Sequence, residues 1–296
     1  MTMVSRTNTL LLGLATLLIA GPAAYAGEMA VPENVTSLAS PEADAKGLPL
    51  GGFRAYPRLS VQGGYDSNIL ASDTGTIEAG RLTLLPSVAV ESQWSRHSLS
   101  FAGFLESRLY PDESDEDYLD WGFGSKGRLD IQEGTNIGGS VNYQNLTESR
   151  NGIDAPAAAP DPSQYDQFDV NAVLNHSFDQ LTGSLGVSYT DLDYSANNQA
   201  YRDREILGGV AQLGYAFSPG YSAFVRAGIN DRNYANDDRF NPGNQKDSTG
   251  YRVVGGISSE LTDLIAREIN VGYLDQDYDS AAYEDVDGLS FGASLL

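Results

Sequence analysis

The side chains that could carry acid–base or nucleophilic chemistry are few in this sequence. Only two histidines occur, His97 and His176, and neither lies in a recognisable motif with a serine and an aspartate. A hydrolytic triad needs these three groups within hydrogen-bond reach of one another. We therefore expect both histidines to be polar residues near the ends of strands, and we expect no catalytic residues and no enzymatic activity.

Acidic residues could support a second chemistry, the binding of a divalent cation. Carboxylates cluster within residues 112–117 and within residues 275–279, and closely spaced carboxylates can ligate calcium. Neither cluster has the glycine and the final glutamate of a calcium-binding loop. Cysteine is absent, which removes thiolate metal sites and disulfides. The sequence thus predicts solvated acidic loops, no cofactor and no metal site.

A third set of chemically active residues consists of charges of both signs within segments where polarity alternates. When the apolar residues of each segment are placed on one face, the opposite face carries a ladder of charges that would line a lumen. Its members are Glu91, Glu106, Arg108, Asp120, Lys126, Arg128, Asp169, Arg226, Arg252 and Glu268. Such a ladder can set the selectivity of a pore, and it can equally form ion pairs that fill the interior. The sequence leaves open whether the lumen is open.

The residues before these segments indicate export. Residues 1–26 have the features of a signal peptide, with Arg6, an apolar run over residues 10–20 and small residues at the cleavage point. The apolar run is shorter than the roughly 20 residues of a spanning helix. Residues 27–55 show no helical or strand period, so we expect a flexible periplasmic segment. The net charge of −22 argues against nucleic acid as a partner.

From Tyr56 onward, the sequence divides into segments of about ten residues in which polarity alternates, the length of a tilted transmembrane strand. Twelve segments can be marked, and residues 137–144 and 181–190 show the alternation most plainly. Connections are alternately short and long, as in barrels with short periplasmic turns and longer outer loops. The sequence therefore predicts an all-β, transmembrane, antiparallel up-and-down β-barrel of about 12 strands over residues 56–296, with both ends in the periplasm.

Aromatic residues cluster where the two membrane interfaces would fall, and amphipathic rings favour this level of a bilayer. A secreted soluble β-sandwich, the alternative fold, has no reason for two such belts. The belt residues are Tyr110, Tyr194, Tyr234 and Tyr278 toward the outer loops, and Trp94, Phe178, Phe217 and Tyr221 toward the turns.

Several short motifs follow one another from residue 56 to the end. They include GYDSNI at residues 64–69, WSRHSL at 94–99, YLDW at 118–121, GYAFSPGY at 214–221, DSTGY at 247–251 and GLSFG at 288–292. In this order they resemble a family of outer-membrane β-barrel porins found alongside exopolysaccharide and capsule biosynthesis genes. The family usually continues for several more hairpins and ends on an aromatic residue, whereas this chain stops at Leu296. We expect either a C-terminally truncated member or one that closes as a smaller barrel.

The resemblance implies a protein of the cell outer membrane that takes part in the biosynthesis or export of exopolysaccharide or capsular polysaccharide. Its implied partners are outer-membrane lipid and lipopolysaccharide, a polysaccharide substrate and periplasmic export components. Two other functions stay open, a general diffusion porin for small solutes and a structural or adhesive barrel with a closed lumen. Because twelve strands enclose only a modest lumen, a glycan conduit would favour the longer form of the family.

Overall fold

The computed structural model describes residues 46–72, 74–150, 161–195, 197–262 and 265–295. The chain divides into two units, residues 1–44 and 45–296, and all of the described residues lie in the second. The predicted signal peptide therefore lies outside the described residues, as do residues 151–160.

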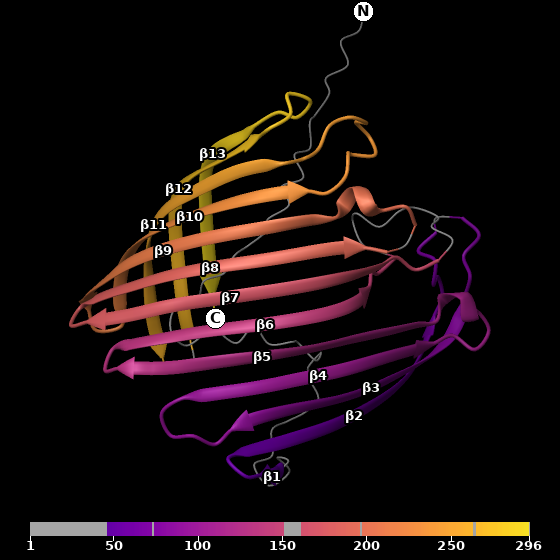
Figure 1. The fold of residues 1–296 in the computed structure, drawn as a ribbon, viewed down its shortest axis with the longest axis horizontal. Helices are drawn as coiled ribbons and strands as arrows, with labels where there is room; N and C mark the ends of the chain where they lie inside the picture. Colours follow the sequence, from indigo (N-terminus) through magenta and orange to yellow (C-terminus); the bar gives the residue numbers. More distant parts are fainter. Residues whose placement is uncertain (1–45, 73, 151–160, 196, 263–264, 296) are drawn as a thin grey trace, which may run out of the picture. The chain divides into compact units, whose positions relative to one another are not determined.

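The described residues form one antiparallel sheet whose strands follow one another in chain order (Figure 1). Two single turns of 3-10 helix, η1 (Ser114–Glu116) and η2 (Ala200–Arg202), lie in loops. No helix of the described part is long and apolar enough to cross a membrane. The strands are β1 (Leu48–Leu50), β2 (Phe53–Asp66), β3 (Ala79–Ser92), β4 (Ser98–Leu109), β5 (Tyr118–Gln132), β6 (Thr135–Thr147), β7 (Gln164–Phe178), β8 (Leu181–Tyr194), β9 (Arg204–Ser218), β10 (Tyr221–Tyr234), β11 (Ser248–Thr262), β12 (Ile265–Tyr278) and β13 (Val286–Leu295).

The up-and-down all-β fold is thus confirmed, and the twelve predicted segments correspond to the twelve long strands β2–β13. The additional strand is the short β1, which pairs with the first residues of β2. Residues 48–50 and 53–55 therefore form strands, although the sequence analysis placed them in the flexible segment. They are too few, and too interrupted by Pro49, Gly51 and Gly52, to show a recognisable period.

Short and long connections alternate along the sheet, as the sequence predicts. Two-residue turns join β5 to β6, β7 to β8 and β9 to β10. Gly134 in the first of these turns has a φ of 74°, and a Cβ there would lie 2.4 Å from the carbonyl oxygen of Ser177. Only glycine fits this combination of backbone angle and close approach. The long loops all lie at the opposite end of the strands.

The two faces of the sheet differ sharply in chemistry. On β8, Leu181, Leu185 and Val187 belong to one face and are each more than half exposed. Their neighbours Ser184 and Ser188 belong to the other face, because successive strand residues point to opposite sides. The same alternation continues across β2–β13, so large exposed apolar side chains share an apolar face, and most hydroxyl, amide and charged groups share a polar face. Several carboxylates near the loop end are exceptions that lie on the apolar face.

The strands are also staggered. One row of register partners crosses the sheet from Arg54, next to the start of β2, to Val286, the first residue of β13. The row therefore climbs from the turn end to the loop end, as expected for the tilted strands of a barrel. Among the described residues, the hydrogen-bonded order runs from β1 to β13 and pairs β13 with neither β1 nor β2.

Candidate functional site on the polar face and its loops

The ten charged residues predicted to line a lumen all lie on the polar face. Glu91 and Lys126 are members of the row that crosses the whole sheet, where the residues between them and beyond are mainly serine, asparagine and glycine. The other eight are an even number of residues from this row along their own strands, which keeps them on the same face. The sequence-based phasing therefore matches the register of the sheet.

Only some of these charges meet one another. Arg108 pairs with Glu106 at 2.8 Å. Arg226 makes a bidentate pair with Glu268 at 3.0 and 3.2 Å and also donates to Gln212. Both guanidinium–carboxylate pairs are largely shielded from solvent, so their attraction is screened less than that of a surface pair. The Arg226 contacts join β9, β10 and β12, whereas the Arg108–Glu106 pair lies within β4.

The carboxylates of the polar face are also held by neutral groups. Asp169 accepts hydrogen bonds from Gln167 and from the hydroxyl of Thr190, each at 2.7 Å. Asp120 accepts a hydrogen bond from the hydroxyl of Thr147 at 2.6 Å. The predicted network of ion pairs is therefore partial, and part of the charge on this face is met by hydroxyl and amide groups.

Further charged residues occupy the polar face that the sequence analysis did not single out. They lie at alternate positions of the same strands, so a strict extension of the alternation over each whole strand would have found them. They are Arg54, Arg58 and Asp66 on β2, Arg81 on β3, Asp130 on β5, Arg204 on β9 and Arg232 on β10.

Several polar atoms on this face are buried without a hydrogen-bond partner among the described residues. All of them belong to the polar face, and most lie on β10, β11 and β12. They are Arg54 Nε, Arg108 Nε, Asn230 Oδ1, Arg232 Nε, Ser248 Oγ, Arg252 Nε, Asn270 Oδ1 and Gln276 Nε2. A buried polar group without a partner costs free energy, and six of these eight atoms lie on β10, β11 and β12.

The eight aromatic residues of the predicted belts divide into two groups. Trp94, Phe178, Phe217 and Tyr221 are 41% to 71% exposed at the turn end of the sheet, where an interfacial belt would lie. Tyr110, Tyr194, Tyr234 and Tyr278 occupy the polar face at the loop end, and the first two are buried. The prediction that these four tyrosines form an outer belt at the lipid surface is therefore wrong, because their side chains lie on the polar face of the sheet.

These four tyrosines instead mark a repeated loop closure. The backbone N–H of each one donates to the carboxylate of an aspartate at the far end of the following loop, and we call each pair a Tyr–Asp clasp. The pairs are Tyr110 with Asp117 (2.5 Å), Tyr194 with Asp203 (2.8 Å), Tyr234 with Asp247 (2.6 Å) and Tyr278 with Asp285 (2.9 Å). Each clasp satisfies a backbone donor at the point where the sheet ladder ends.

Neighbouring clasps are connected to one another. The backbone carbonyl of Asp203 accepts the N–H of Ala235, and the carbonyl of Asp247 accepts the N–H of Asp279. Burial raises the pKa of Asp203 above its ordinary value, the Tyr194 N–H opposes this shift, and nearby carboxylates add to it. The loops of β8–β9, β10–β11 and β12–β13 thus form a linked series at the rim of the sheet.

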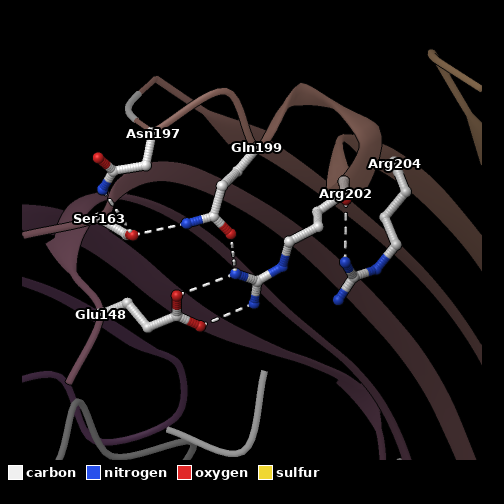
Figure 2. A network of polar contacts seen from close by, with 6 residues as sticks. All are labelled: Glu148, Ser163, Asn197, Gln199, Arg202 and Arg204. Atoms are coloured by element: carbon white, nitrogen blue, oxygen red, sulfur yellow. Dashed lines mark hydrogen bonds and ion pairs between the residues drawn. The ribbon is translucent and has the colours of Figure 1, made fainter. Parts of the chain in front are cut away.

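A second cluster joins the β6–β7 and β8–β9 loops (Figure 2). The guanidinium of Arg202 makes a bidentate pair with Glu148 at 2.7 and 2.9 Å, lies 4.1 Å over the Tyr194 ring and donates to Gln199. The Gln199 side chain is fully buried and donates to the Ser163 hydroxyl at 2.6 Å. Asn197 donates to the same hydroxyl at 3.1 Å. The cluster therefore fixes two adjacent loops against each other.

The histidines and the acidic loops have structural contacts of their own. His97 Nδ1 accepts the backbone N–H of Asp130, and His176 shares a hydrogen bond with Thr135. In the first acidic cluster, Glu116 pairs with Arg150. Within the described part of the chain, no group of three or more acidic or histidine side chains is arranged to hold a metal ion.

One family model matches most of the chain. It is described as putative beta-barrel porin 2 and matches residues 40–296. The chain belongs to this family. The translocator domain of the autotransporter NalP from Neisseria meningitidis is similar at 14% identity over 83% of this chain and 88% of that domain, with a TM-score of 0.32. A search of curated proteins finds no match.

Because the chain belongs to the β-barrel porin family, it is an outer-membrane β-barrel protein. This membership also indicates which environment each face of the sheet contacts. In such a protein the apolar face meets lipid and the opposite face turns inward. The charges and amides described above belong to the polar face of this porin-family member. The Tyr–Asp clasps and the Arg202 cluster belong to its loop end.

Proposed function

We propose that this protein lines a hydrophilic passage through the outer membrane and takes part in the export of an exopolysaccharide or capsular polysaccharide. The observation that carries the proposal is the polar face, on which hydroxyl, amide and guanidinium groups follow one another across β2–β13. A glycan chain in transit exchanges hydrogen bonds with such groups without leaving them unsatisfied. The row of serine and asparagine side chains across β4–β8 offers further partners for sugar hydroxyls.

The proposal includes the expected partners and excludes catalysis. The apolar face would contact outer-membrane lipid and lipopolysaccharide, and the turn end would face periplasmic export components. We assign no enzymatic step to the protein, since the polar face supports binding and passage through hydroxyl, amide and guanidinium groups. The peptide groups at the free edges of β2 and β13 must also be paired inside hydrocarbon, so the passage requires these edges to be covered.

The test is deletion of the gene followed by measurement of surface polysaccharide, with complementation by the wild-type gene as control. A loss of surface polysaccharide that complementation restores supports the export role, and an unchanged yield overturns it. Swelling of proteoliposomes in sugars of graded size then separates the remaining functions. Uptake with an unchanged polysaccharide yield identifies a general diffusion porin, whereas no uptake of any sugar identifies a structural or adhesive barrel.

A further inference from the structure

The distribution of charge on the polar face is opposite to that of the whole chain. The protein carries a net charge of −22, yet the polar face of β9–β12 presents Arg204, Arg226, Arg232 and Arg252. Among the described side chains on this face of the same four strands, Glu268 is the one acidic group beside these four arginines. This part of the wall is therefore cationic in an otherwise acidic protein.

The carboxylates of these strands lie on the other side of the sheet. Glu205, Asp231, Asp275 and Asp277 occupy apolar-face positions near the loop end. A strand separates side chains on its two faces, and the carboxylates point away from the arginines. The segregation of charge by face leaves the arginines without local neutralisation by these groups.

The arginines form a ladder along the strand direction. In the register of the sheet, Arg204 is opposite Tyr234 at the loop end and Arg252 is opposite Gly228. Arg232 and Arg226 lie on β10 itself. The interval from Tyr234 to Arg226 corresponds to about 26 Å of strand. With a strand tilt of about 40° this is about 20 Å along the membrane normal, or about two thirds of the hydrocarbon core. The ladder therefore starts at the loop end and covers part of the passage.

Two arginines of the ladder have no acidic partner among the described residues. Arg226 is paired with Glu268 and Gln212. Arg232 and Arg252 form no ion pair with a described residue, and the Nε atom of each is buried without a hydrogen-bond partner. A partly buried guanidinium without a counter-charge is costly, and its planar fork matches a carboxylate in a bidentate geometry.

We infer that the passage selects anions, and that the polysaccharide of the proposed export function is acidic and carries carboxylate groups. Arg232 and Arg252 bind these carboxylates in succession as the chain passes, and Arg204 attracts the chain at the loop end. Binding at several weak sites in series allows a solute to enter and to leave. This inference rests on the proposed function for the nature of the solute, whereas the ion selectivity of the wall follows from the arginines alone.

The first test uses the full chain in planar bilayers under a potassium chloride gradient. The reversal potential gives the permeability ratio of chloride to potassium, and we expect chloride to be preferred. The double variant R232Q/R252Q should lower this ratio at least twofold, because it removes two unpaired charges from the wall. The matched control is R239Q, which removes an arginine from an exposed loop and should leave the ratio unchanged. A preference for potassium in the wild type, or equal ratios in wild type and double variant, would overturn the inference.

The second test measures binding to the detergent-solubilised protein by titration calorimetry, with oligogalacturonate as the acidic probe and maltooligosaccharide of equal length as the neutral one. We expect the acidic probe to bind the wild type more tightly than the neutral probe does. Its binding to R232Q/R252Q should be about a hundredfold weaker, since the variant loses two hydrogen bonds between charged groups and each is worth on the order of a decade in affinity. Equal binding of the two probes, or no difference between wild type and double variant, contradicts the inference. Selective binding without any conductance retains the anion site and instead overturns the proposed passage.

Discussion

The carboxylate of Asp203 accepts a hydrogen bond from the backbone N–H of Tyr194 at 2.8 Å, and this contact closes the β8–β9 loop at its base. The aspartate and the tyrosine are nine residues apart in sequence, and the two positions follow the same pattern as three other loops. Because the donor is the last N–H of a strand, the side chain replaces a strand partner that the sheet no longer provides.

Replacing Asp203 by alanine removes the acceptor and should lower the free energy of unfolding by about 1–3 kcal/mol, the usual cost of a buried donor left without a partner. Asp203→Asn keeps an acceptor oxygen and removes the negative charge. Burial raises the pKa of the Asp203 carboxyl, which means that the folded protein disfavours this charge. We therefore expect the asparagine variant to be at least as stable as the wild type at pH 7. Urea unfolding in detergent micelles measures both variants, and equal losses in the two would contradict the clasp.

The environment of Asp238 predicts a loss of stability in acid. Burial opposes its ionisation, but the N–H of Phe240, the hydroxyl of Tyr283 and the ammonium of Lys246 together lower its pKa below the ordinary value of 3.8. A carboxyl with a lowered pKa stabilises the folded state above its unfolded pKa, and this contribution disappears as the pH falls through the folded pKa.

Unfolding midpoints measured from pH 7 to pH 2 should therefore fall more steeply below about pH 4 in the wild type than in Asp238→Asn. The asparagine variant keeps one acceptor oxygen for the N–H of Phe240, and its NH2 group can donate to the hydroxyl oxygen of Tyr283 instead of accepting from it. It therefore serves as a control that removes the charge while both contacts can still form. If the two proteins showed the same decline in acid, the lowered pKa would have no role in loop stability.

The Glu148–Arg202 pair should couple two loops energetically. Its side chains are 14% and 12% exposed, and a bidentate pair shielded in this way is stronger than a surface pair. A double-mutant cycle with E148A and R202A should give a coupling energy of about 1 kcal/mol or more. The comparison pair is Arg128–Asp130, whose more exposed partners should couple by about 0.5 kcal/mol or less. A larger value for the exposed pair would refute the assignment.

The assignment of the two faces makes a prediction for neighbouring residues of β8. Val187 belongs to the apolar face and Ser188 to the polar face. Arginine at position 187 should destabilise the folded protein in lipid by about 2–4 kcal/mol, the cost of a charge on the lipid side near the midplane. Ser188→Arg introduces the same side chain on the other face and should cost much less. Folding yield into liposomes and urea unfolding measure both effects, and a reversed order would invert the face assignment.

The strands, their faces and most of their connections could be predicted from the sequence because each depends on neighbours along the chain. Alternation over residues 181–190 fixes the two faces of β8 whatever its partners are. Turns such as Asp179–Gln180 are local as well, and the predicted alternation of short and long connections is present in the structure.

The loop contacts could not be predicted because their partners are distant in sequence. Glu148 and Arg202 are 54 residues apart, and neither residue shows by its immediate neighbours that it pairs with the other. The position of the clasp tyrosines was predicted wrongly for a different reason. Tyrosine at a strand end is typical of a lipid interface, but the alternation of the preceding strand, continued to its end, places Tyr110 and Tyr194 on the polar face, where both are buried.

The linked clasps also limit how the mouth of the protein can move. Asp203 and Asp247 each bond to their own hairpin through the carboxylate and to the next hairpin through the backbone carbonyl. Three successive hairpins are thereby joined at the loop end. One of these loops cannot move away from the rim without breaking the backbone hydrogen bond that joins it to its neighbour. We expect the entrance to keep a nearly constant bore, so that a traversing molecule must fit the opening that it finds.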